Sequence, residues 1–266
     1  MKSQKGQVLL IIVMLLATAI TVVLSITFKA TTDIQLSKLE EENQKALAAA
    51  EAGIEEALQK NVGETVALGG LPGLSGFVGD ATVTTAVSNT FVSPLLQIDQ
   101  QYTLYLSDYP NFTNPLSGDT SIWYGSEGTT CDSMAIEVTY IYLDTTSGTY
   151  KMKRYLADSG SKLGSGGTDK LSVTSINSAL DTTTFQCKTQ NLTVPTVGSE
   201  SPTVLIVRTL FAATRLGFKR EDVGNLKPQG KYVTSEAMNT NTRVTKKIQL
   251  FQSYPQLPME FFITSF

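Results

Sequence analysis

Residues 1–58 read MKSQKGQVLLIIVMLLATAITVVLSITFKATTDIQLSKLEEENQKALAAAEAGIEEAL, and this stretch decides the fold of the chain. A short leader with Lys2 and Lys5 and no acidic residue is followed by an uncharged stretch over residues 7–28. The 21 residues from 8 to 28 would rise about 32 Å as an α-helix, which is enough to cross a bilayer. Because positive charge before an apolar segment favours the cytoplasmic side, we expect one membrane span with residues 1–6 inside the cell.

The span continues into a charged segment, residues 33–58, in which no proline interrupts the chain. Apolar residues recur there at three- and four-residue spacing, with Asn43 filling one gap: Leu36, Leu39, Leu47, Ala50, Ile54 and Leu58. This spacing predicts an amphipathic helix with a narrow apolar stripe, continuous with the span over residues 7–60. The glutamates between them are interpreted as a solvated face, not as acid–base or metal-binding groups: Glu40, Glu41, Glu42, Glu51, Glu55 and Glu56.

Small residues gather near the end of this predicted helix, in the run Ala49-Ala50-Glu51-Ala52-Gly53. Gly53 costs about 1 kcal/mol of helix stability relative to alanine, so its presence needs a reason. Two explanations stay open and are compatible with each other. The run offers a smooth face to another backbone, or it packs against the β-rich part of its own chain.

Three export signals fit the N-terminus. A secretory signal peptide would end at a small-x-small site such as Ala17-Thr18-Ala19, but the apolar run continues for nine residues beyond it. A plain signal anchor explains the length of the run but not the abrupt end of the leader at Gly6. A prepilin-type leader is short and basic, ends in glycine, and is followed at once by the apolar segment.

The leader ending in Gly6, the continuous apolar-to-amphipathic helix and the run from Ala49 to Gly53 together resemble the N-terminal region of PilX-type minor pilins, in the type IV pilin-like superfamily. The resemblance covers residues 1–60. It implies cleavage by a prepilin peptidase between Gly6 and Gln7, N-methylation of Gln7, and assembly with other pilin subunits through the N-terminal helix.

The sequence departs from the pilin pattern at Ile11, where most major pilins carry a glutamate. That glutamate is thought to pair with the N-terminus of a neighbouring subunit, and a buried charge is costly unless it is paired. Ile11 therefore suits a tip or initiating subunit, or a lineage that does without this pairing. Gln7 also replaces the more usual aromatic first residue.

Downstream of the helix the expected fold is β-rich. Residues 61–80 contain six glycines and one proline and are predicted to be a linker. Residues 135–143 and 149–156 predict a hairpin, with Gly148 at positive φ in its turn. Further strands are expected at 81–87, 101–106, 121–124, 171–176, 183–188, 203–210, 213–218, 231–236 and 243–251. The aromatic tail, residues 257–266, is expected to form a final strand, and an exposed partner-binding patch is the alternative.

The predicted fold class is therefore α+β: a long transmembrane and amphipathic helix followed by a β-rich head with antiparallel sheets over residues 81–266. A candidate boundary within the head lies near residues 158–169, which are rich in glycine and serine.

Composition excludes several classes of function. Histidine is absent, which removes His general bases, His-containing triads and His metal ligands. The net charge of −3 and the lack of a basic block argue against nucleic-acid binding. Cys131 and Cys187 form no C-x-x-C pair, so one long-range disulfide and two free buried thiols both stay open. No phosphate-binding loop occurs, and we expect no cofactor, no metal and no enzymatic activity.

Two clusters in the head have a functional and a structural interpretation. The oxygen-rich loop over residues 108–119 could hold calcium, but turn chemistry explains the same residues and is favoured. Six aromatics could form a sugar- or surface-binding platform, but core packing is favoured: Tyr102, Tyr105, Tyr109, Phe112, Trp123 and Tyr124.

These observations predict a minor pilin or pilin-like subunit. It would cross the inner (cytoplasmic) membrane once, with its head outside the cytoplasm, and join a cell-surface filament for assembly, adhesion or tip contact. Loss of the leader would change the formal charge from −3 to −5, because Lys2 and Lys5 are removed. The alternatives are a signal-anchored surface-binding protein or enzyme unrelated to pili, and a secretion-system pseudopilin. The sequence does not identify a host or surface ligand.

Overall fold

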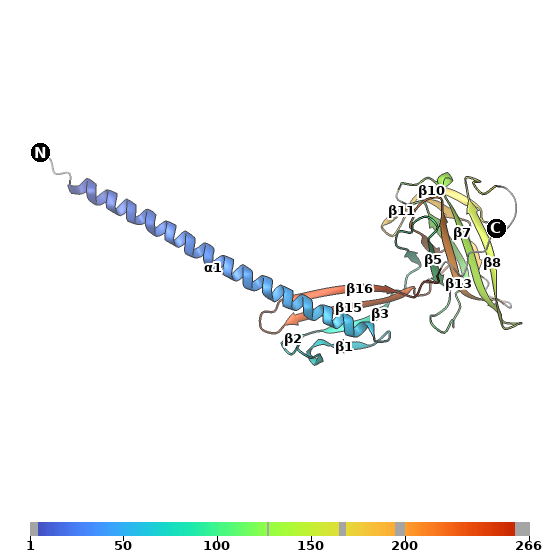
Figure 1. The fold of residues 1–266 in the computed structure, drawn as a ribbon, viewed down its shortest axis with the longest axis horizontal. Helices are drawn as coiled ribbons and strands as arrows, with labels where there is room; N and C mark the ends of the chain where they lie inside the picture. The colour runs from blue at the N-terminus through green and yellow to red at the C-terminus, as the bar shows by residue number, and fades with distance from the viewer. Residues whose placement is uncertain (1–4, 127, 165–168, 195–199, 259–266) are drawn as a thin grey trace. The chain divides into compact units, whose positions relative to one another are not determined.

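A computed structural model describes residues 5–126, 128–164, 169–194 and 200–258 of the chain. The fold class is α+β, as the sequence predicts, with one long helix followed by antiparallel sheets (Figure 1). The chain divides into two compact units. The first combines the chain up to Val83 with Val233–Leu250, and the second holds Thr84–Tyr232 and the chain from Phe251.

Helix α1 spans Lys5–Leu58 without interruption (Figure 1). The absence of proline and the run of aliphatic residues permit this length, and the helix ends two residues before the predicted limit at residue 60. Lys60 N donates to Ala57 O (3.0 Å) and Gln59 N to Glu56 O (3.3 Å), which closes the last turn.

The second half of α1 packs on a five-stranded sheet of order β1-β3-β15-β16, in which β2 pairs with β15. Its strands are β1 (Thr65–Ala67), β2 (Phe77–Val78), β3 (Asp80–Thr85), β15 (Gly230–Asn239) and β16 (Thr245–Ser253), with the short 3₁₀ helix η1 (Leu68–Gly70) after β1. Ile54 and Ala57 of the helix form a cluster with Ala81, Val83 and Val233 of the sheet.

The predicted linker over residues 61–80 is instead part of the first unit. It contains β1, η1 and β2, and Leu68 is fully buried beneath α1. Val66 and Leu68 supply the apolar contacts that hold this glycine-rich stretch in place. The candidate boundary near residues 158–169, of which 165–168 lie outside the described residues, does not coincide with any of the three places where the chain passes between the units.

The second unit contains two sheets. One has the order β10-β11-β6-β14-β4, with β12 paired to β6, and the other has the order β5-β13-β7-β8-β9. The pairing of β8 with β9 is parallel, and the other pairings found in these two sheets are antiparallel. The strands are β4 (Thr90–Val92), β5 (Gln101–Tyr105), β6 (Gly118–Tyr124), β7 (Ala135–Asp144), β8 (Thr149–Asp158), β9 (Asp169–Lys170), β10 (Val173–Leu180), β11 (Thr183–Thr189), β12 (Leu192–Val194), β13 (Glu200–Leu210) and β14 (Gly217–Arg220), with the 3₁₀ helix η2 (Cys131–Ser133) before β7.

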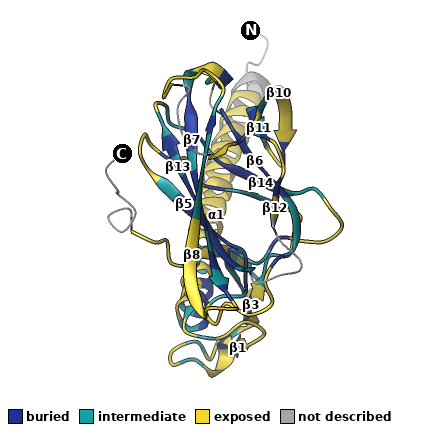
Figure 2. Ribbon diagram, turned by 90° about the vertical axis from the view of Figure 1, so that its right-hand side faces the viewer, coloured by how far each residue is buried: buried dark blue, intermediate teal, exposed yellow. Residues whose placement is uncertain are grey.

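The main core of the second unit draws side chains from both sheets. Tyr124 and Phe218 come from the first, and Leu104, Ile136 and Leu205 from the second; all five are fully buried. In Figure 2 strands of both sheets carry long buried stretches. This shared core explains why alternating apolar residues located most of the strands in the sequence.

One predicted strand is shorter than expected, three short strands were not predicted, and the predicted tail strand lies mostly outside the described residues. The predicted strand over residues 213–218 is present as β14 only from Gly217 onward, and before it Thr214 forms an isolated antiparallel bridge with Leu96. Strands β4, β9 and β12 were not predicted, since each has three residues or fewer. Of the predicted tail strand, residues 259–266 lie outside the described residues. Its described start at Leu257 is tied to Gln101 and Thr103 of β5.

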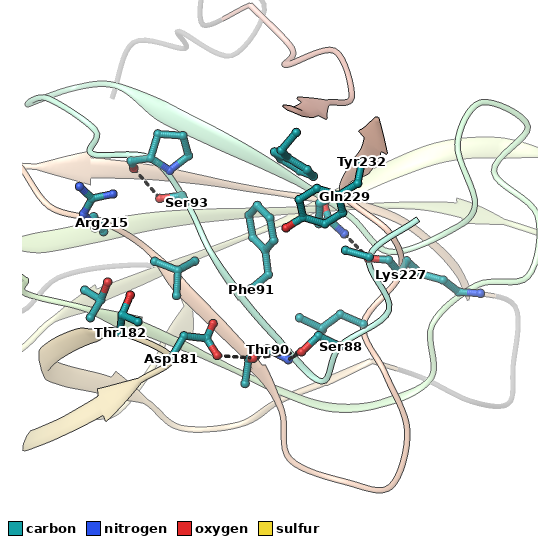
Figure 3. Close-up of a pocket in the computed structure, with 16 residues that line it drawn as sticks. Ser88, Thr90, Phe91, Ser93, Asp181, Thr182, Arg215, Lys227, Gln229 and Tyr232 are labelled. Atoms are coloured by element: carbon teal, nitrogen blue, oxygen red, sulfur yellow. Dashed lines mark hydrogen bonds between the residues drawn. The ribbon is translucent and has the colours of Figure 1, made fainter. Parts of the chain in front are cut away.

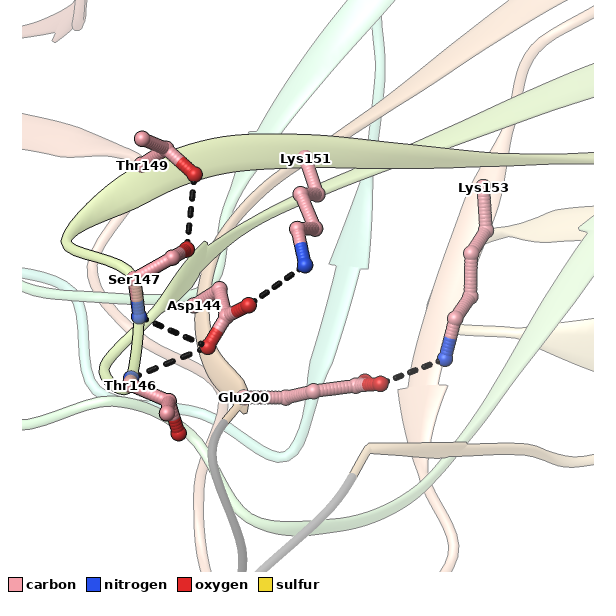
Figure 4. A network of polar contacts seen from close by, with 7 residues as sticks. All are labelled: Asp144, Thr146, Ser147, Thr149, Lys151, Lys153 and Glu200. Atoms are coloured by element: carbon pink, nitrogen blue, oxygen red, sulfur yellow. Dashed lines mark hydrogen bonds and ion pairs between the residues drawn. The ribbon is translucent and has the colours of Figure 1, made fainter.

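The predicted β7–β8 hairpin is present, in register from Ala135–Asp158 to Asp144–Thr149. Gly148 has a φ of +67°, as its place in the turn requires. Figure 4 shows that Asp144 organises this turn: Oδ1 accepts Thr146 N (2.9 Å), and Oδ2 accepts Lys151 Nζ (2.5 Å). Lys153 Nζ pairs nearby with Glu200 Oε1 at 2.7 Å.

Replacing Lys151 with methionine is expected to raise the pKa of Asp144. In the native hairpin the hydrogen bond from Lys151, and next the Thr146 amide, hold this carboxyl pKa well below its usual range. A carboxylate with a lowered pKa stabilises the folded state above its unfolded pKa of about 3.9, and this contribution is lost as pH falls towards the folded pKa. An NMR titration of the carboxyl carbon measures the change. Lys247→Met, which alters the looser pair with Glu236 (3.9 Å), should leave Asp144 unchanged; an unchanged Asp144 pKa in Lys151→Met would contradict the assignment.

Candidate functional site

The exposed half of α1 is the most unusual surface of the chain. All described side chains from residue 9 to residue 41 are exposed, and those up to Phe28 are mostly aliphatic. Phe28 is 77 % exposed and Ile11 57 %. Large contiguous apolar surfaces mark sites of contact with membrane or protein. By length and composition, α1 is long and apolar enough to cross a membrane.

Three threonine hydroxyls in the apolar half of the helix bond to the helix itself. Thr18 Oγ1 donates to Leu15 O (2.9 Å), Thr21 Oγ1 to Thr18 O (2.8 Å) and Thr27 Oγ1 to Val23 O (2.9 Å). These are the bonds to the preceding turn that such residues form in apolar surroundings. The three threonines therefore do not oppose burial of the segment in lipid or among other helices.

The predicted processing site lies at the start of α1. Residues 1–4 of the leader lie outside the described residues. The backbone of Gly6 and Gln7 is helical, and nothing is described of the Gln7 side chain. Ile11 lies one helical turn further on, on the exposed part of the helix.

The small-residue run at the other end of α1 faces the chain's own sheet. Ala49 and Ala50 are fully buried against Leu68 and Ala237. A Cβ on Gly53 would overlap the Leu68 side chain and lie 2.5 Å from Ser235 Oγ. Glycine is therefore required here by close contact between helix and sheet. Within the run, Glu51 is exposed and Ala52 is half-buried.

This burial bears on two expectations from the sequence. Of the two explanations left open for the run, packing on the chain's own sheet is present, and it buries Ala49, Ala50 and Gly53. The assembly role stays a prediction for Ile11, Glu51 and Ala52. The predicted apolar stripe is buried only in part. Leu36 and Leu39 are exposed because burial against the sheet begins only near residue 42, and Leu47 is exposed although it lies beyond that point. The buried face consists of Ala46, Ala49, Ala50, Gly53, Ile54 and Ala57.

A hydrogen bond marks the place where α1 meets its sheet. Asn239 Nδ2, at the end of β15, donates to Glu42 Oε2 at 2.7 Å. Lys45 lies one turn on, 2.8 Å from Glu41 Oε1 and 3.2 Å from Glu42 Oε1. Sequence reasoning missed the bond from Asn239, since no local pattern connects positions so far apart. The exposure of Glu40, Glu41, Glu51 and Glu55 agrees with a solvated acidic face.

Cys131 in η2 and Cys187 in β11 form a disulfide, with their Cα atoms 5.3 Å apart. The sequence left this pairing and two free thiols equally open. The bridge belongs to the core of the second unit, where Cys187 is fully buried.

The six aromatics that are close in sequence separate in the structure. Tyr102, Tyr124 and Trp123 are buried in two core clusters. Tyr105, Tyr109 and Phe112 gather instead with Tyr254, which sequence reasoning missed; the Tyr109 and Tyr254 rings stack at 4.7 Å. Core packing therefore accounts for the first three and for Tyr105, which is buried with Val204 and Ile206, and Tyr109 packs against that cluster.

Oxygen ligands in the loop over residues 108–119 are engaged by the protein itself. Asp108 accepts Asn114 Nδ2 (2.8 Å) and lies 3.2 Å from Lys227 Nζ. Asp119 accepts Thr193 Oγ1 (2.8 Å). Within the described parts of the chain, no group of three or more acidic, Cys or His residues is placed to hold a metal ion.

No family model matches this chain, and neither a curated protein nor a solved structure matches it. A proposal about its function therefore rests on α1, on the second unit, and on the resemblance of residues 1–60.

Proposed function

We propose that this chain is a minor subunit of a type IV pilus or a related pilin-like filament. The observation that carries the proposal is the division of α1 into two halves. Residues 9–41 are exposed and apolar up to Phe28, whereas the same unbroken helix is packed on its own sheet near Leu58. A helix of this kind serves as a membrane anchor before assembly and as an apolar contact surface afterwards.

In this proposal α1 crosses the inner membrane with Lys2 and Lys5 in the cytoplasm, and the second unit lies outside. Prepilin peptidase removes residues 1–6, and other pilin subunits contact the helix after assembly. The contact surface is the exposed part of α1, including Ile11, because Ala49, Ala50 and Gly53 are buried. The work of the subunit would be assembly, adhesion or tip contact, without turnover of a substrate.

Mass spectrometry of the mature N-terminus tests the proposal. In cells that contain a prepilin peptidase, the chain is expected to begin at Gln7, with an added methyl group on its amino group. A chain that begins at Ile20 would indicate signal-peptidase cleavage after Ala19, and an intact Met1 would indicate a plain anchor. Either result would overturn the pilin assignment.

Two variants sharpen this measurement. Gly6→Val is expected to abolish cleavage, so that the full-length chain accumulates in the membrane fraction. Ser3→Val, in the same leader, is the matched control and should be cleaved normally. Recovery of the processed chain in filaments sheared from the cells supports a pilus subunit, and its absence from them would favour the secretion-system pseudopilin.

A further inference from the structure

The second unit contains a cavity of about 680 Å³ that plays no part in the proposal for α1. Its walls come from β4, from the β10–β11 turn, from residues 226–229 and from the adjoining ends of β15 and β16, and all sixteen lining residues belong to the second unit. Small-molecule sites commonly have volumes of about 300–1,000 Å³. The cavity is therefore large enough for a ligand of several rings.

Aromatic rings form one wall of the cavity. The centroids of Tyr232 and Phe251 are 5.0 Å apart, and those of Phe91 and Phe251 are 6.3 Å apart. All three side chains are half-buried, so part of each ring remains accessible. Figure 3 shows Phe91 near the middle, with polar side chains around it. Partly exposed aromatic rings provide a ligand with apolar contact area at low cost in side-chain entropy.

Oxygen atoms line the opposite wall. Thr90 Oγ1 donates to Asp181 Oδ1 at 3.0 Å and lies 3.1 Å from Ser88 Oγ (Figure 3). Asp181 is exposed at the tip of the β10–β11 turn, with a φ of +53°. A carboxylate next to two hydroxyls offers several acceptors and donors within a short distance, an arrangement that suits neighbouring hydroxyl groups of a ligand.

The charges around the cavity do not favour one sign. Asp181 is acidic, Arg215 and Lys227 are basic, and Lys227 Nζ lies only 3.2 Å from Asp108 Oδ1. A site for an anion or a cation would concentrate charge of the opposite sign. The lining is therefore better matched to a neutral ligand.

A second hollow of about 540 Å³ shares Thr182, Thr183 and Arg215 with the first. Its other lining residues are Gly128, Thr184 and Gln186, so neutral hydroxyl and amide groups dominate. Two adjoining hollows, one aromatic and one rich in hydroxyls, suit a ligand built of repeated units.

We propose that these two hollows form a binding site for a neutral oligosaccharide. The apolar C–H face of one sugar ring packs on the wall formed by Phe91, Tyr232 and Phe251, and its hydroxyls bind Asp181 and Thr90. A following sugar unit lies against Thr182 and Thr184. The site is independent of the role of α1, so a failure of the pilin proposal leaves it standing.

Isothermal titration calorimetry of the full chain in detergent micelles tests the site. The probes are maltotetraose, cellotetraose, chitotetraose and lacto-N-tetraose, with a sialylated tetrasaccharide and a tetrapeptide for comparison. At least one neutral tetrasaccharide is expected to bind with a Kd of about 1 mM or tighter. The absence of binding by all four neutral probes, or binding of only the sialylated probe or the peptide, would overturn the proposal.

Matched variants place the binding in the cavity. Tyr232→Ala and Asp181→Asn are each expected to weaken it about tenfold, through lost ring contact and a lost charged acceptor. Tyr150→Ala, at an exposed tyrosine of β8, and Asp99→Asn, at another exposed aspartate with positive φ (66°), should bind like the native chain. Because asparagine tolerates positive φ, Asp181→Asn decides the matter if Tyr232→Ala does not fold. Native affinity in Asp181→Asn, or equal losses in the two control variants, would refute the assignment.

Discussion

Replacing both Cys131 and Cys187 with alanine is expected to lower the free energy of unfolding of the second unit by about 4 kcal/mol. The bridge connects residues 56 positions apart, and closing a loop of that length lowers the entropy of the unfolded chain. For a unit of this size, the loss corresponds to a fall of about 10 °C in the unfolding midpoint. Differential scanning calorimetry of the full chain in detergent measures the change.

Two controls separate the bridge from its surroundings. A reducing agent should lower the midpoint of the native chain towards that of the double variant, and should leave the double variant itself unchanged. Thr130→Ala, at the exposed residue that precedes η2, should unfold at the native temperature, because the Thr130 side chain makes no capping hydrogen bond. The entropic account fails if the double variant unfolds at the same temperature as the native chain.

Gly53→Leu is expected to separate α1 from its sheet, at a cost of about 3 kcal/mol or more. A Cβ at this position already overlaps Leu68, lies 2.5 Å from Ser235 Oγ and is 3.4 Å from Ala81 Cβ. Relief would require the helix to move off the sheet, which exposes Ile54 and Ala57. Native-state hydrogen exchange of the amides in residues 45–58 and in β3 should show faster exchange in the variant.

Ala48→Leu is the matched control for this substitution. Ala48 lies on the same part of α1 but is exposed, so leucine there meets solvent and should leave hydrogen exchange unchanged. Gly53→Ala should fall between the two, because its methyl group makes the same first contacts while alanine gains about 1 kcal/mol of helix propensity. Native protection in Gly53→Leu would show that the helix and sheet adapt without separating.

Local patterns in the sequence predicted the elements of this fold well. The uncharged run and the absence of proline determine α1, and strict alternation with a glycine in the turn determines the β7–β8 hairpin. Both signals lie within a few residues of each other in the chain. The shortest strands lack such a signal, because two or three residues do not establish a period.

The extent of burial on α1 could not be predicted in the same way. Leu36 and Leu39 fit the helical stripe as well as Ile54 does, yet they are exposed. What decides burial is the reach of the sheet, and β15 and β16 belong to the opposite end of the chain. Gly53 illustrates this. The sequence indicated that a glycine at this position needs a reason. Ser235, which is close to Gly53 in space, is distant in sequence and could not be predicted as part of that reason.

The candidate sites differ in the same way, because some lie in one continuous segment and others combine segments that are distant in sequence. The long apolar helix is continuous in sequence and could be predicted there, and the leader stays a prediction. The Cys131–Cys187 pairing was one of two open possibilities, and the cavity draws on segments from Ala86 to Phe251 that share no motif. Sites assembled from distant segments depend on strand order, which periodicity alone does not determine.

The segment Val233–Leu250 lies near the end of the chain but belongs to the first unit, and this order has a consequence for biosynthesis. Translation delivers α1 first, but two strands of the sheet that covers its small-residue face leave the ribosome only near the end. At about 5–20 residues per second, the helix waits many seconds with Ala49, Ala50 and Gly53 uncovered. A nascent chain is therefore exposed to premature pairing of these faces, and a message truncated before the codon for Val233 would yield a helix that never acquires its own cover.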